Sequence, residues 1–139
     1  MNTEDQDTRW MNMAVKLAEK GVGLTSPNPC VGAVIVHENQ VIGSGFHEKA
    51  GLPHAERKAI ADGTARGNAA LFADSTLYVT LEPCSTTGKT PPCTEAILEH
   101  HFKRVVYGSQ DPNPRHRGAA ADILGRAGIQ VTRGILEKE

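Results

Sequence analysis

Residues 75–109 read STLYVTLEPCSTTGKTPPCTEAILEHHFKRVVYGS. The stretch begins with a run rich in β-branched and aromatic residues and passes through a loop containing Gly and Pro. It then takes on helical spacing over 93–101 and ends in a second β-rich run at 103–109. The first run is apolar enough to be a strand buried on both faces. A strand, a helix and a strand in this order predict a parallel unit within an α/β fold.

The sequence on either side extends the pattern. On the C-terminal side, a loop at 111–118 precedes an expected helix over 119–128 and an expected strand over 129–135. On the N-terminal side, two short β-rich runs at 31–37 and 41–46 are close enough to form a hairpin. The hairpin would supply an antiparallel part, so we expect an α/β sandwich with a mixed sheet.

Two further helices are expected in the first half of the chain. Apolar residues from Trp10 to Leu17 recur at helical spacing and predict a helix over 9–20, with residues 1–8 as a frayed lead. The segment HAERKAIADG (54–63) suits a second helix that closes at its glycine. With 139 residues and no internal repeat, the whole chain is expected to form a single domain.

Composition narrows the class of function. Hydrophobic residues make up 39% and charged residues 22%, as is usual for a globular domain. The net charge of −1, with 4% aromatic residues, favours neither nucleic-acid binding nor base stacking. The N-terminus MNTEDQDTRW is unlike a signal peptide, and no run approaches the ~18 apolar residues of a membrane span. We therefore expect a cytoplasmic protein whose three cysteines stay reduced.

Four residues whose side chains could bind a metal or transfer a proton lie at the ends of the expected elements. His54 and Glu56 begin one helix, Cys84 follows the buried strand, and Cys93 begins the next helix. Ligands of open α/β sheets gather at the carboxyl ends of strands, and a helix N-terminus favours the thiolate that binds metal. One His and two Cys would leave the fourth position of a tetrahedral zinc ion open for water.

Glu56 suits general acid–base work beside such a metal. Zinc lowers the pKa of a bound water towards ~7, and a neighbouring carboxylate can take its proton and pass it to a leaving amine. His54 and Glu56 are two residues apart and would diverge on a regular helix. We therefore expect His54 to lie at the non-helical start. The pattern H-A-E with a later P-C and C is a signature of zinc deaminases.

The longer spacing between the cysteines, Cys84-STTGKTPP-Cys93, marks a particular family. Together with SPNPCVGAVIV (26–36), GSGFHEKAGLPHAE (43–56) and DPNP (111–114), it resembles the deaminase domain of the bifunctional riboflavin-biosynthesis deaminase/reductases. The resemblance runs from about Trp10 to Gly134.

The resemblance implies a fold, a site and a substrate. It implies a cytidine-deaminase-like three-layer α/β/α sandwich that forms a homo-oligomer and acts on diaminohydroxyphosphoribosylaminopyrimidine, a pyrimidine ribosyl phosphate. The positions that match the zinc ligands are His54, Cys84 and Cys93, and Glu56 matches the proton shuttle. The positions that match substrate contacts are Asn28, His47 and Lys89. It also implies a dimer or tetramer, and the reductase domain of the family is not expected in these 139 residues.

Two departures from the family pattern lie in loops expected to face the substrate. Thr86 stands where a histidine is usual, and 115–117 (RHR) replaces a pattern of small and apolar residues. These departures allow a second hypothesis, in which the chain is a deaminase of another free base, nucleoside or nucleotide. A third hypothesis is a non-catalytic zinc-binding domain, in which Cys30 or His47 would complete the ligand set. A carboxylate at Glu56 argues against it.

Overall fold

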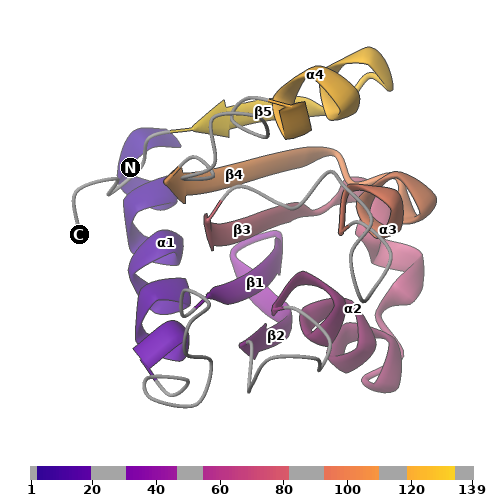
Figure 1. Ribbon diagram of the computed structural model, residues 1–139. Helices are drawn as coiled ribbons and strands as arrows, with labels where there is room; N and C mark the ends of the chain where they lie inside the picture. Colours follow the sequence, from indigo (N-terminus) through magenta and orange to yellow (C-terminus); the bar gives the residue numbers. More distant parts are fainter. Residues whose placement is uncertain (1–2, 20–30, 47–54, 82–92, 110–118, 134–139) are drawn as a thin grey trace.

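The computed structural model describes residues 3–19, 31–46, 55–81, 93–109 and 119–133, which form a five-stranded sheet covered by helices (Figure 1). In chain order the elements are α1 (Thr3–Glu19), β1 (Gly32–His37), β2 (Gln40–Phe46), α2 (Ala55–Ala65), the 3-10 helix η1 (Ala69–Asp74), β3 (Thr76–Leu81), α3 (Cys93–His100), β4 (Arg104–Ser109), α4 (Ala119–Arg126) and β5 (Gln130–Arg133). No helix in these ranges is long and apolar enough to cross a membrane.

The sheet is mixed, with strand order β2-β1-β3-β4-β5. β1 runs antiparallel to both of its neighbours, whereas β3, β4 and β5 are parallel to one another. The predicted α/β sandwich is therefore confirmed, with the β1–β2 hairpin as its antiparallel part. β3, α3 and β4 form the parallel unit that the stretch 75–109 predicts, and α4 connects β4 to β5 in the same way.

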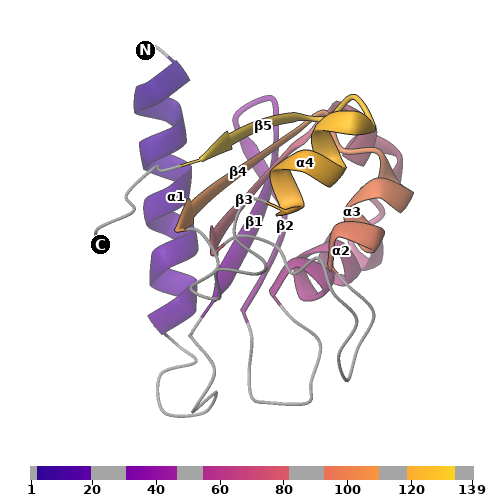
Figure 2. The ribbon, with the colours of Figure 1, turned by 45° about the horizontal axis from the view of Figure 1, so that its top comes forward.

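Side chains of the central strands alternate between two apolar layers. In β1, Ala33 and Ile35 pack with residues of α2, α3 and α4, whereas Val34 and Val36 pack with residues of α1. β3 and β4 alternate in the same way, as the two-residue period of a strand requires. Figure 2 shows α1 against one face of the sheet and the other three α-helices against the opposite face. The arrangement is the three-layer sandwich expected from the resemblance.

The hairpin turn is tighter than the sequence indicated. Only Glu38 and Asn39 lie between the strands, with φ angles of 47° and 65°. Two-residue hairpins favour positive φ at both positions because their twist then matches that of the strands. The helix η1 is a second difference, since the sequence pattern predicts no helix or strand over 69–74. Its Phe72 is buried and stacks on Phe102 with ring centroids 5.3 Å apart.

The expectation of a frayed lead over 1–8 is wrong for residues 3–8, which form the first turns of α1. Asp7 anchors them because it is only 2% exposed and lies beside Arg104 of β4. Arg104 Nη1 and Nη2 donate to Asp7 Oδ1 and Oδ2, both at 2.8 Å, and the Tyr78 hydroxyl donates to Oδ1 at 2.8 Å. Paired carboxylate and guanidinium groups are the usual way to bury such charges.

The same cluster spans three strands. Arg104 Nη2 also donates to Thr132 Oγ1 of β5 at 2.8 Å. Burial, with the hydrogen bond to Asp7, raises the pKa of the Tyr78 hydroxyl well above its usual value. The hydrogen bond to Asp7 likewise raises the pKa of Arg104. Both donors therefore stay protonated at neutral pH, and the cluster ties α1 to β3, β4 and β5.

We expect Asp7→Ala to lower the free energy of unfolding by about 3–5 kcal/mol, because it leaves the Arg104 guanidinium buried without its counter-charge. Urea unfolding followed by circular dichroism measures the change. Asp74→Ala is the matched control. Asp74 is 69% exposed and pairs with His37 at 3.3 Å, so its removal is expected to cost less than about 1 kcal/mol. Equal effects of the two variants would contradict the anchoring role of Asp7.

Candidate active site

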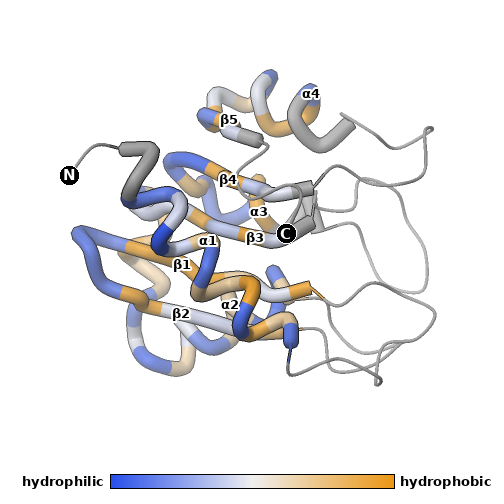
Figure 3. Tube along the Cα trace, turned by 90° about the vertical axis from the view of Figure 1, so that its left-hand side faces the viewer, coloured by the Kyte–Doolittle hydropathy of each residue, from blue (hydrophilic) through white to orange (hydrophobic). Residues whose placement is uncertain are grey.

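The strands β2, β3 and β4, which precede α2, α3 and α4, all finish at the same end of the sheet. We call this end the carboxyl edge. Gly32 at the start of β1 pairs with Phe46 at the end of β2, and Ala33 pairs with Val79 near the end of β3. Leu81 and Ser109, the last residues of β3 and β4, also pair. Figure 3 shows these strand ends on one side of the molecule. Ligands of open α/β sheets bind at such an edge.

α2 runs back along β2 and brings its first turn to this edge. A Cβ atom built on Gly45, near the end of β2, would lie 2.8 Å from the Ala59 nitrogen. A Cβ atom on Gly43 would lie 3.0 Å from the Gly63 nitrogen, one turn further along the helix. The helix and the strand are therefore antiparallel, and Ala55 and Glu56 lie beside the end of β2.

Glu56 is buried in the first turn of α2, with 3% of its surface exposed. A helix N-terminus stabilises a negative charge. Two further polar side chains in the described ranges are buried: Asp7 pairs with Arg104, and Ser75 Oγ donates to the Leu71 carbonyl at 2.6 Å. A carboxylate buried at the ligand-binding edge of an α/β sheet is a candidate for proton transfer.

Cys93 is the first residue of α3, the neighbour of α2 on the same face of the sheet. Ile97, one turn further along α3, is fully buried in the apolar layer that also contains Ala55. As the helix of a crossover between parallel strands, α3 starts at the carboxyl end of β3. Glu56 and Cys93 are thus both in the first turns of neighbouring helices at one edge, and a helix N-terminus there favours a thiolate.

The other residues predicted for the site lie outside the described residues. These are the predicted zinc ligands His54 and Cys84 and the predicted substrate contacts Asn28, His47 and Lys89. Of Cys93 the backbone is described. Within the described ranges no three His, Cys, Asp or Glu side chains form a metal-binding group, and two of the three predicted ligands are not in those ranges.

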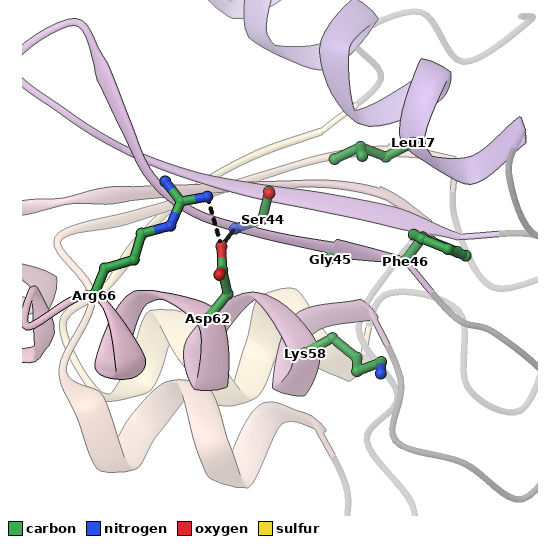
Figure 4. A pocket seen from close by; sticks show the side chains of 7 residues that line it. All are labelled: Leu17, Ser44, Gly45, Phe46, Lys58, Asp62 and Arg66. Carbon is green, nitrogen blue, oxygen red and sulfur yellow. Dashed lines mark hydrogen bonds and ion pairs between the residues drawn. The ribbon is translucent and has the colours of Figure 1, made fainter.

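A pocket along the outer edge of β2 was not anticipated from the sequence. It has a volume of about 340 Å³ and lies between Leu17 of α1, Ser44 and Phe46 of β2, and Asp62 of α2 (Figure 4). Asp62 Oδ2 accepts the Ser44 N–H at 2.9 Å and pairs with Arg66 at 3.0 Å. The sequence carried no signal for this contact, because it depends on how the helix lies on the strand.

Comparison with known proteins identifies the family to which this chain belongs. Residues 4–109 match the family described as the cytidine and deoxycytidylate deaminase zinc-binding region. The chain belongs to this family, and the fold predicted from the resemblance is that of its members.

Within this family, the chain is highly similar in sequence to proteins of riboflavin biosynthesis. The riboflavin biosynthesis protein RibD of Aquifex aeolicus is 48% identical over 133 residues, which are 96% of this chain and 36% of the relative. RibD of Escherichia coli is 45% identical over 136 residues, 96% of this chain and 35% of the relative. The chain thus spans about a third of the length of these relatives. The resemblance to the riboflavin deaminases read from the sequence is confirmed.

Solved structures agree with this placement. RibD of Acinetobacter baumannii superimposes with a TM-score of 0.92 at 46% identity, covering 99% of this chain and 37% of that one. A deaminase/reductase from Thermotoga maritima gives 0.91 at 44% identity, with 99% and 38% covered. The dCMP deaminase of the cyanophage S-TIM5 gives 0.67 at 19% identity, which shows a shared fold.

We expect the purified chain to contain about one zinc ion, since a catalytic zinc site needs only three protein ligands. Elemental analysis measures the content. Stripping the metal with a chelator is expected to lower the melting temperature, because an ion that binds the folded state stabilises it. A metal-free chain that melts at the same temperature with or without added zinc would contradict this prediction.

Proposed function

We propose that this chain is a zinc-dependent hydrolytic deaminase of riboflavin biosynthesis, acting on diaminohydroxyphosphoribosylaminopyrimidine. The single observation that carries the proposal is the burial of Glu56 at the start of α2, on the edge where Cys93 begins α3. The relatives support the choice of substrate, since the Thermotoga protein is described as a diaminohydroxyphosphoribosylaminopyrimidine deaminase and 5-amino-6-(5-phosphoribosylamino)uracil reductase. We propose that the 139 residues act as one deaminase domain.

The proposed metal ligands are His54, Cys84 and Cys93. One imidazole and two thiolates suit zinc, and the start of α3 is a favourable place for the thiolate of Cys93. Zinc, when bound, would lower the pKa of a water molecule towards ~7 and so make a nucleophile available at neutral pH. Thiolate ligands need a reducing compartment, which supports the cytoplasm as the proposed location.

Glu56 is the proposed proton carrier. Hydrolytic deamination forms a C–O bond from water and breaks the C–N bond of the ring amine, so one proton must leave the water and another must reach the departing nitrogen. A single carboxylate can accept the first and deliver the second. The buried position of Glu56 keeps bulk water from competing for these protons. Ammonia then leaves as a neutral molecule.

The remaining predicted residues would orient the substrate. We propose that Asn28, His47 and Lys89 contact the base, the ribose and the phosphate, the ammonium of Lys89 being suited to the phosphate charge. The near-neutral net charge of the chain supports a small-molecule substrate over a nucleic acid. A homo-oligomer is the proposed assembly, as the resemblance implies.

A deaminase of another base, nucleoside or nucleotide remains the alternative within the same chemistry. Thr86 and the RHR stretch at 115–117, which depart from the family pattern, are the observations that favour it. A substrate panel separates the two, since the riboflavin-pathway hypothesis predicts turnover of the diaminopyrimidine ribosyl phosphate, and the alternative predicts turnover of another base, nucleoside or nucleotide instead.

We expect the zinc-loaded chain to release ammonia from the ribosyl phosphate, and Glu56→Gln to lower kcat by at least about 100-fold, because general acid–base catalysis contributes that much or more. Ammonia release over a panel of aminopyrimidines and aminopurines, with and without ribose phosphate, measures both. Zinc content should be unchanged in Glu56→Gln and lost in the double variant Cys84→Ser, Cys93→Ser. Full turnover by Glu56→Gln would exclude the proton-carrier role, and zinc retained by the double cysteine variant would exclude the ligand set.

A further inference from the structure

Two glycines of β2 lie where any side chain would collide with α2. A Cβ atom on Gly43 would approach the carbonyl oxygen of Ala59 to 2.6 Å, and one on Gly45 would approach the Ala59 nitrogen to 2.8 Å and the Lys58 Cβ to 2.5 Å. These are mainly backbone atoms, which cannot move aside as the end of a flexible side chain can. Neither glycine has a φ angle in the left-handed region. Space, and not backbone conformation, is therefore what requires glycine at both positions.

The helix face that meets these glycines is the face that carries Glu56. Glu56, Ala59 and Gly63 are spaced by three and four residues, so they share one face of α2. All three are buried. Glu56 is less than one helical turn from Ala59, so a displacement of the helix at Ala59 displaces the carboxylate as well.

Asp62 of α2 and Asn68, three residues after α2 ends, hold this segment in register along the strand. Asp62 Oδ2 accepts the Ser44 N–H at 2.9 Å, and Asn68 Nδ2 donates to the Ile42 carbonyl at 3.0 Å. β2 is an edge strand, so these outward-facing backbone groups have no strand neighbour. Figure 4 shows Asp62 reaching from α2 to the strand. The glycines thus set how close α2 lies, and the polar contacts set where along β2 it lies.

We propose that Gly43 and Gly45 are positioning residues for Glu56, because they allow α2 to lie in backbone contact with β2. The inference rests on the proposed function. An alanine at Gly43 would be about 0.8 Å short of the 3.4 Å at which ordinary contact begins. A misplacement of about 1 Å in a catalytic site can cost about 100-fold in rate.

The test compares Gly43→Ala and Gly45→Ala with Gly125→Ala, where a Cβ atom would meet nothing within 4 Å. We expect kcat per folded molecule to fall by about 100-fold in the first two variants, with a much smaller change in KM, and to stay at the wild-type value in Gly125→Ala. Circular dichroism gives the folded fraction and elemental analysis the zinc content of each variant. A wild-type kcat in folded, zinc-loaded Gly43→Ala or Gly45→Ala would overturn the proposal, since a merely structural role predicts that result.

A milder set of variants applies if the alanine variants do not fold. Asp62→Ala should lower kcat, and Asp62→Asn should restore it because its amide oxygen can still accept the Ser44 N–H. Arg66→Ala is the control, since it removes the ion pair on the outer side of Asp62 without touching the strand. Equal kcat in Asp62→Ala and Arg66→Ala would count against the proposal.

A crystal structure of Gly43→Ala, or of Asp62→Ala if the former does not fold, separates this inference from the proposed function. Glu56 should move away from β2 together with Ala59 relative to the wild-type protein. If Glu56 stays in place, the positioning role is wrong, whatever the activity. If the wild-type chain releases no ammonia but the helix shift is seen, the proposed function fails while the geometric inference stands.

Discussion

Backbone contact between α2 and β2 is the constraint on which the rest of this structure depends. The helix can lie this close because Gly43 and Gly45 face Ala59 and Gly63 without side chains between them. The contact brings the first turn of α2 to the edge of the sheet where β2, β3 and β4 end. Glu56 is buried there, in a place where desolvation makes a carboxylate costly and a helix N-terminus makes it tolerable.

The two edges of the sheet serve different purposes. At the amino ends of β3 and β4, the buried charge of Asp7 is matched by the Arg104 guanidinium and the Tyr78 hydroxyl, and this cluster ties α1 to three strands. At the opposite edge, Glu56 and Cys93 lie in the first turns of the neighbouring helices α2 and α3. In the sequence, each is next to a segment that carries other predicted site residues.

Much of the fold could be predicted from local patterns. The apolar, β-rich run Ala33–Val36 predicts a strand, which the structure places between two apolar layers, and the change to helical spacing at Cys93 predicts the crossover helix. Glu56 stands out because its neighbours in sequence are those of a known zinc motif. The zinc ligands and substrate contacts themselves remain predictions.

What could not be predicted depends on residues far apart in the chain. Nothing near Asp7 indicates that a partner 97 residues away will bury it, so the start of α1 looked like a frayed end. The glycines of β2 are similar, since a Gly-Ser-Gly run by itself only weakens a strand. Their role in the close approach of α2 becomes evident only in the structure, where Ala59 and Gly63 lie against them.

The proposed chemistry requires zinc and Glu56 to share one site without Glu56 being a ligand. Anomalous diffraction from crystals of the zinc-loaded protein would locate the metal relative to Glu56. We predict one strong zinc peak at about 2.0–2.1 Å from a nitrogen of His54 and about 2.3 Å from the sulfurs of Cys84 and Cys93, with no fourth protein ligand. The Glu56 carboxylate should face the open position. A zinc ion closed by four protein ligands, whether Glu56, Cys30 or His47 is the fourth, would contradict the account.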